Sequence, residues 1–323
     1  MKRTRWHILV FLAPAFIIYT VFMIFPLFDS LRVSLQVPVE VASIDTTSAD
    51  ATTETNIAQT NTLTHVFSFD NYRTLVRDPQ WAPRLFGALR NNILFFSVHM
   101  LVQNPVGLIL AVLLASKVVV GRSIYRTLIF TPTVLSVVLI GFIWRLILSP
   151  LWGVSEDILG AIGLARLNQP WLGLERTALI TLSLVSVWQY VGIPMLLFSA
   201  ALVGIPEMYT EAAEVDGASS WQVFWRIQFP LLLPTVGIVS VLTFVGNFNA
   251  FDLIYTTQRA LAGPNFSTDI LGTFFFRTFF GVQLQPGNPT MGAAIAGVMF
   301  VIIFAGVLLY YFGYQRRLKR VEL

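Results

Sequence analysis

Six long apolar runs divide this 323-residue chain, and they limit what it can fold into. Each is long enough to cross the hydrocarbon core of a bilayer as a helix, which takes about 20 residues. Backbone groups inside lipid must be satisfied within the protein, which favours helices. We therefore expect an all-α polytopic membrane protein with about six transmembrane helices, at residues 8–28, 91–115, 125–148, 178–203, 231–255 and 291–314.

The composition excludes several other classes of protein. Charged residues make up only 12% of the chain, far below the share in soluble domains. The absence of cysteine excludes disulfides and thiolate chemistry, and the three histidines lie far apart in sequence. The chain carries none of the glycine-rich, zinc-binding or hydrolase motifs that mark common enzyme sites. We expect no catalytic activity, cofactor or metal, and the net charge of +4 is small for nucleic-acid binding.

Basic residues predict the orientation in the bilayer, because cytoplasmic loops carry an excess of lysine and arginine. They gather in both tails and in the loop after the second run, which places the N- and C-termini in the cytoplasm. Arg73, Arg77 and Arg84 lie on the opposite side, but long translocated segments depend less on charge. The basic residues concerned are Lys2, Arg3, Arg5, Lys117, Arg122, Arg126, Arg316, Arg317, Lys319 and Arg320.

The predicted organisation has four parts. Part of the second, residues 41–64, is rich in Thr, Ser and Ala and contains no lysine or arginine, so we expect a flexible or lightly ordered insertion there. The four parts are a tail and first helix (1–28), an extracytoplasmic insertion (29–90), a transmembrane core (91–315) and a basic tail (316–323).

A polar segment at residues 206–230 interrupts the apolar pattern between the fourth and fifth runs. Asp216-Gly217 indicates a turn after a short helix, and Ser219-x-x-Gln222 indicates a capping box that starts a second helix. We expect Pro230 to end that second helix. One interpretation is an amphipathic linker at the membrane surface. The other is a helix that docks into a groove on a partner.

The order of residues in this segment favours docking. Glu211-Ala212-Ala213, three residues, Gly217, nine residues, Ile227, one residue and Phe229-Pro230 resembles the EAA loop of ATP-binding-cassette importer permeases. The family has leucine where this chain has Phe229. Stretches such as "FLAPAFIIYTVFMIFPLFDSLRVSL", "VWQYVGIPMLLFSAAL" and "NFNAFDLIY" resemble the sugar-permease branch, over most of residues 8–315. "QRALAGP" and "GVQLQPGNPT" depart from it.

The resemblance implies a MetI-like permease fold and a set of partners. These are a second permease subunit, two cytoplasmic ATPase subunits and an extracytoplasmic solute-binding protein, in a lipid bilayer. It also implies that the loop couples ATP hydrolysis to transport, although Gly217 would serve equally as an ordinary helix cap. The implied coupling residues are Glu211, Ala212, Ala213, Gly217, Ile227 and Pro230.

Polar residues inside apolar runs are costly and are candidates for a solute pathway. Two clusters combine amides, a carboxylate and aromatic rings, which suit sugar hydroxyls and ring faces. The alternative is hydrogen bonding between helices. Gln103 and Asn104 are interpreted instead as ties for backbone freed by Pro105. The pathway candidates are Trp188, Gln189, Tyr190, Asn247, Asn249, Phe251 and Asp252.

Two other functions compete with this interpretation. A secondary transporter driven by an ion gradient would be expected to show paired intramembrane carboxylates or inverted repeats, whereas Asp252 is nearly the only candidate acid. A scaffold without transport activity would leave the order of the 206–230 segment unexplained.

Overall fold

The computed structural model describes residues 6–43, 60–116, 119–151, 153–161, 163, 165–282 and 286–315. The predicted basic tail at 316–323 lies outside the described residues. The chain divides into two compact units, each of which is described by itself. The first comprises Met1–Leu85 and Phe275–Val298, and the second comprises Phe86–Phe274 and Met299–Leu323.

The first unit combines helices with a two-stranded sheet. Strands β1 (Gln36–Ser43) and β2 (Thr60–Phe67) pair antiparallel, from Gln36 opposite Phe67 to Ser43 opposite Thr60. The expectation of little order is therefore wrong for both ends of the 41–64 segment, where β-branched residues favour strands. The unit's helical elements are α1 (Trp6–Tyr19), the π-turn η1 (Thr20–Ile24), α2 (Phe25–Ser34) and α3 (Asp70–Arg77).

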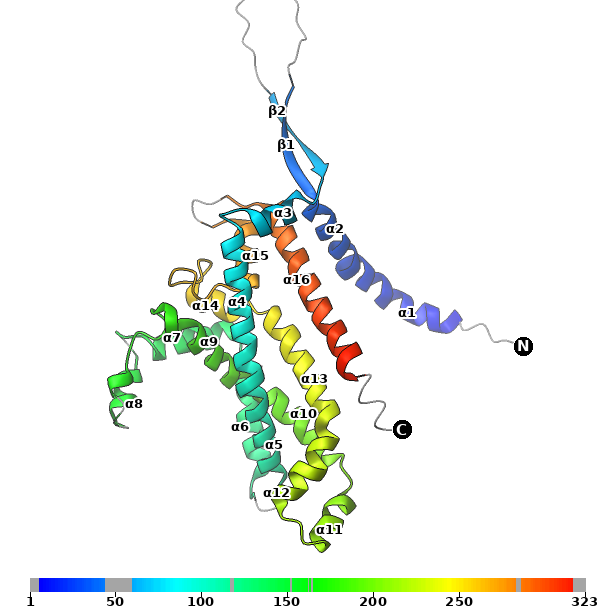
Figure 1. The fold of residues 1–323 in the computed structure, drawn as a ribbon, viewed down its shortest axis with the longest axis vertical. Coiled ribbons are helices and arrows are strands. Elements are labelled where there is room, and N and C mark those ends of the chain that lie inside the picture. Colours follow the sequence, from blue (N-terminus) through cyan, green and yellow to red (C-terminus); the bar gives the residue numbers. More distant parts are fainter. Residues whose placement is uncertain are drawn as a thin grey trace, which may run out of the picture. The chain divides into compact units, whose positions relative to one another are not determined.

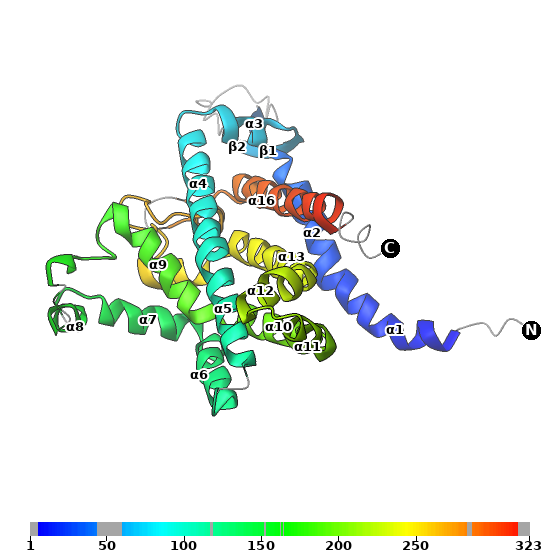
Figure 2. The ribbon, with the colours of Figure 1, turned by 60° about the horizontal axis from the view of Figure 1, so that its bottom comes forward.

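The second unit is almost entirely helical. Figure 1 shows its helices by label, and Figure 2 shows most of them from another side. Helix α4 begins in the first unit, α15 ends in it, and α16 begins in it. The elements are α4 (Ala82–Val98), η2 (His99–Gln103), α5 (Asn104–Ala115), α6 (Arg122–Val134), α7 (Val137–Ile147), α8 (Ser155–Ala161), η3 (Ala165–Leu167), α9 (Glu175–Tyr190), α10 (Gly192–Val203), α11 (Glu207–Val215), α12 (Ser220–Val223), η4 (Phe224–Gln228), α13 (Phe229–Phe248), α14 (Asp252–Gln258), α15 (Leu271–Phe280), α16 (Pro289–Tyr310) and η5 (Tyr311–Gln315).

The expected helical membrane architecture is confirmed, although strands β1 and β2 make the chain mostly helical and not all-α. Four helices among the described residues are long and apolar enough to cross a membrane, and two bent pairs bring the number to six if each pair is one span. The pair α6–α7 bends by 96° at Leu135 and Ser136, whose backbones are extended. The pair α9–α10 bends by 42°. The single spans are Val10–Ser34, Ala82–Ala115, Ser220–Gln258 and Pro289–Gly313.

Three π-turns let helices continue through prolines. In each case the proline is the second residue after the π-turn, and the pairs that follow the turns are Phe25-Pro26, Asn104-Pro105 and Phe229-Pro230. The residue before the proline donates its N–H to the carbonyl five residues back, from Phe229 to Phe224 in the third case. The widened turn absorbs the disruption of the helix ladder that proline causes. The expectation that Pro230 ends its helix is therefore wrong, because the chain continues into α13.

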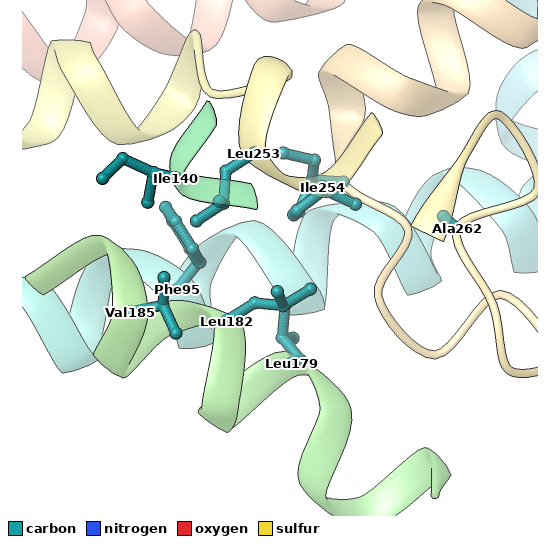
Figure 3. Close-up of a cluster of buried hydrophobic side chains, with 9 residues drawn as sticks. Phe95, Ile140, Leu179, Leu182, Val185, Leu253, Ile254 and Ala262 are labelled. Carbon is teal, nitrogen blue, oxygen red and sulfur yellow. The ribbon is translucent and has the colours of Figure 1, made fainter. Parts of the chain in front are cut away.

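Two apolar cores hold the second unit together. The first joins α4, α7, α9 and α14 through Phe95, Ile140, Leu182 and Ile254 (Figure 3). The second joins α5, α10 and α13 through residues that include Phe198.

Small residues set the helix spacing next to these cores. A Cβ added at Gly107 of α5 would lie 2.9 Å from Pro194 of α10. One added at Gly192 would lie 2.8 Å from the Cα of Phe130. Glycine at these positions permits close approach of membrane helices.

Candidate functional site

The polar segment forms the expected helix, glycine turn and helix. Helix α11 ends in a Schellman motif, in which the Ala218 N–H donates to the Ala213 carbonyl at 2.9 Å. The Gly217 N–H donates to the Glu214 carbonyl at 3.0 Å, and Gly217 has a φ of +79°. This left-handed conformation strains residues that carry a Cβ. The motif satisfies the last carbonyls of α11 and fixes where the chain turns.

The second helix of the segment begins with the expected capping box. The Ser219 N–H donates to Gln222 Oε1 at 2.8 Å, and the Gln222 N–H donates to Ser219 Oγ at 3.4 Å. Phe229, where the family pattern has leucine, packs its ring against Trp225 with centroids 4.9 Å apart. The segment is therefore ordered by its own short-range contacts.

Helix α11 presents an apolar stripe outward. Met208 and Val215 are 66% and 88% exposed, and Ala212 lies between them at helical spacing. Glu211 is exposed beside this stripe, and Gly217 is exposed at the turn. Of the other coupling candidates, Pro230 is exposed, whereas Ala213 and Ile227 are half-buried. Exposed large apolar side chains on an ordered polar segment are typical of an interaction surface.

A cavity of about 330 Å³ lies in the second unit, between helices α4, α9, α10, α13 and α14 and the η2 turn. Five of the seven pathway candidates line it, and the structure thus brings together two clusters that are far apart in sequence. These five are Tyr190, Asn247, Asn249, Phe251 and Asp252.

The other two candidates lie outside this cavity. Gln189 is fully buried, and its Nε2 donates to the Leu135 carbonyl at 3.3 Å. The backbone carbonyl of Gln189 accepts a hydrogen bond from Thr133 Oγ1 at 2.9 Å. Gln189 thus ties α9 to the bend between α6 and α7. Trp188 is 43% exposed and packs edge-to-face against Trp144.

Four polar residues line the cavity that the sequence analysis did not select: His99, Gln103, Ser186 and Thr243. His99 Nδ1 lies 2.8 Å from the Phe95 carbonyl, which can only accept, so Nδ1 carries the hydrogen. In the neutral imidazole, Nε2 then accepts from Ser186 Oγ at 2.9 Å. The four-residue spacing of His99 and Gln103 would have indicated one shared helix face.

The wall on α13 forms a second polar network. Thr243 Oγ1 donates to Asn104 Oδ1 at 3.1 Å, and Asn247 Nδ2 donates to the Thr243 carbonyl at 2.7 Å. We expected the Asn104 amide to bind backbone groups freed by Pro105. This expectation is wrong for Asn104 Oδ1, because that atom accepts from the side chain of Thr243. Asn247 Oδ1 and Gln103 Oε1 are buried and have no hydrogen-bond partner among the described residues.

Asn92 joins this wall to two other elements. It is fully buried, and its Nδ2 donates to the Asn247 carbonyl at 2.9 Å. Its Oδ1 accepts from the Leu271 N–H at 2.7 Å. The neighbouring Asn91 donates to the carbonyls of Ser267 and Asp269. This asparagine pair fixes the loop before α15 to α4.

Comparison with known proteins agrees with this architecture. The family model described as "Binding-protein-dependent transport system inner membrane component" matches residues 103–320. The "Probable ABC transporter permease protein YurN" of Bacillus subtilis (strain 168) is 33% identical over 73% of this chain and 77% of its own. The "Arabinooligosaccharides transport system permease protein AraP" of Halalkalibacterium halodurans is 30% identical over 69% of this chain and 68% of its own.

A solved structure shares the fold. It is described as "Crystal structure of bacterial alginate ABC transporter in complex with alginate pentasaccharide-bound periplasmic protein". One chain of it superposes with a TM-score of 0.74 at 20% identity, covering 97% of this chain and 96% of that chain.

Proposed function

Since the chain belongs to the family of binding-protein-dependent transport system inner membrane components, we propose that it is the permease subunit of a carbohydrate importer. It forms half of the pathway beside a second permease subunit. An extracytoplasmic solute-binding protein delivers the solute, and two cytoplasmic ATPase subunits supply the energy. Both termini and the 206–230 loop face the cytoplasm.

The cavity supports the carbohydrate part of the proposal. Its wall combines amides, hydroxyls, one carboxylate and the aromatic rings of Phe95 and Phe251. Such a mixture suits hydroxyl groups and the apolar faces of sugar rings. The name of the arabinooligosaccharide relative points to the same class of solute.

The coupling part rests on one observation, the outward apolar stripe of α11 next to Glu211. A helix that docks into a groove needs such a face, and the fixed Schellman turn would transmit the movement of a docked α11 to the second helix. Nucleotide-driven closure of the ATPases then shifts the permease between two arrangements of rigid helices. Glu211, Ala212, Ala213 and Gly217 are the proposed contacts with the ATPase, supported by Ile227 and Pro230.

The test is co-purification of the ATPase subunits with the membrane-embedded complex. Glu211→Lys reverses a charge on the docking helix and is expected to reduce both ATPase retention and solute uptake at least tenfold. Glu156→Lys, on the exposed first turn of α8, is the matched control and should leave both unchanged. Full retention and uptake in Glu211→Lys would contradict the coupling role. Uptake by complexes that lack any ATPase would point to an ion-driven transporter instead.

A further inference from the structure

The cavity carries negative charge without a compensating cation. None of the described residues that line it is lysine or arginine, whereas Asp252 contributes a carboxylate. Asp252 is exposed, and its carboxylate has neither a hydrogen bond nor an ion pair among the described residues. An anion that enters this space therefore meets a like charge and no opposite one.

Three hydrogen-bond donors of the wall are consumed within the protein. The hydrogens on His99 Nδ1, Ser186 Oγ and Thr243 Oγ1 each reach an acceptor inside the chain. In the neutral imidazole, this leaves lone pairs on the two hydroxyl oxygens but no further hydrogen. A carboxylate needs donors, because an ionised carboxylate only accepts.

Two buried acceptors of the wall, in contrast, have no hydrogen-bond partner among the described residues. Asn247 Nδ2 donates to the Thr243 carbonyl, which fixes the opposite atom of this amide as oxygen. That oxygen has no hydrogen-bond partner in the described part of the chain, although the residue is only 6% exposed. The second such atom is Oε1 of Gln103, which is also buried without a partner among the described residues; Gln103 is likewise 6% exposed. Leaving a buried acceptor unpaired is unfavourable, so a ligand that brings donors would be stabilised here.

We infer that this cavity selects solutes by charge: it accepts neutral polyhydroxylated or amine-bearing sugars and rejects sugars that carry a carboxylate, sulfate or phosphate. Asp252 is the specificity-determining residue, and Asn247 and Gln103 are acceptors for ligand hydroxyls or ammonium groups. The inference rests on the proposed function, because it assumes that the cavity holds the transported sugar.

The test uses three probes that share one pyranose ring and differ in charge: methyl β-glucoside, glucosamine and methyl β-glucuronide. They are titrated by saturation-transfer NMR against the full complex in nanodiscs, without the binding protein. We expect the neutral and amine probes to bind at least tenfold more tightly than the uronide. In Asp252→Asn the difference should fall below threefold. Glu175→Gln, a carboxylate in the first turn of α9 outside the cavity, should leave the order unchanged.

Equal affinity of the uronide and the glucoside in the natural complex would overturn the inference. An unchanged order in Asp252→Asn would overturn the role of Asp252. If that variant does not assemble, the order of the three affinities in the natural complex decides. Binding of none of the probes would overturn the cavity as a sugar site, whereas uptake of sugars by intact cells with the binding protein present tests the proposed function separately.

Discussion

At the scale of single residues, Gly217 has the most clearly defined conformational role. Its φ of +79° lies in the region that L side chains rarely adopt. A Cβ added there would meet none of the described residues within 4 Å, apart from its two chain neighbours. Any cost of substitution therefore comes from the backbone conformation and not from a clash. Asparagine tolerates the left-handed conformation better than other residues, and β-branched side chains tolerate it poorly.

We therefore predict that Gly217→Val uncouples ATP hydrolysis from solute uptake, with a loss of uptake of at least tenfold, whereas Gly217→Asn retains most of it. Both variants should assemble, since the glycine is exposed. The measurement is uptake and ATPase activity in proteoliposomes that contain the full complex. Equal activity of the two variants would show that the left-handed turn is not required.

Single residues also explain which parts of the cavity could be predicted. Trp188, Gln189 and Tyr190 are consecutive in a helix, so their side chains point in directions about 100° apart. They cannot all face one cavity, and only Tyr190 does. His99 and Ser186 lie 87 positions apart and are joined by one hydrogen bond. No local pattern could have indicated that contact.

At the scale of elements, short-range chemistry made the polar segment predictable. The capping box and the Schellman turn use residues within five positions of each other, so their sequence signals suffice. The π-turns and the β1–β2 ladder were not predictable in this way. A proline can end, kink or pass through a helix, and the hairpin pairs residues up to 31 positions apart, as Gln36 with Phe67.

Asn92 joins three elements, α4, α13 and the start of α15, through two hydrogen bonds. We predict that Asn92→Leu lowers the free energy of unfolding by about 1–3 kcal/mol, because it leaves the buried Leu271 N–H without its partner. In Asn92→Asp a carboxylate oxygen still accepts from the Leu271 N–H, so the part of the loss in unfolding free energy that comes from this N–H should be smaller. Denaturant titration of the complex in detergent measures the change. Asn249→Ala, which removes one exposed intrahelical bond, is the control, and an equal effect would contradict the prediction.

At the scale of the whole molecule, the number and apolar character of the helices followed from sequence because about 20 apolar residues suffice to identify a span. The sharp bend between α6 and α7 did not, since Leu135 and Ser136 carry no breaker signal of their own. The orientation of the chain remains a prediction that rests on its basic residues.

The absence of natural cysteines offers a direct test of that orientation. Single cysteines placed at Gln80 and Ser123 occupy exposed positions on opposite predicted sides of the membrane. In intact cells, a membrane-impermeant maleimide should label Gln80→Cys and not Ser123→Cys. Both should react after the cells are opened. The reverse labelling pattern would invert the proposed topology and move the 206–230 loop away from the ATPases.

The buried Asn92 has a consequence for how the cavity can open. The nitrogen of its side-chain amide donates to the cavity wall, and the oxygen accepts from the start of α15. Both partners are therefore held by the same residue of α4. A gradual widening at that end would stretch both bonds at once, and both are buried. Opening of this end of the cavity should therefore be all-or-none, because it requires both hydrogen bonds of Asn92 to break together.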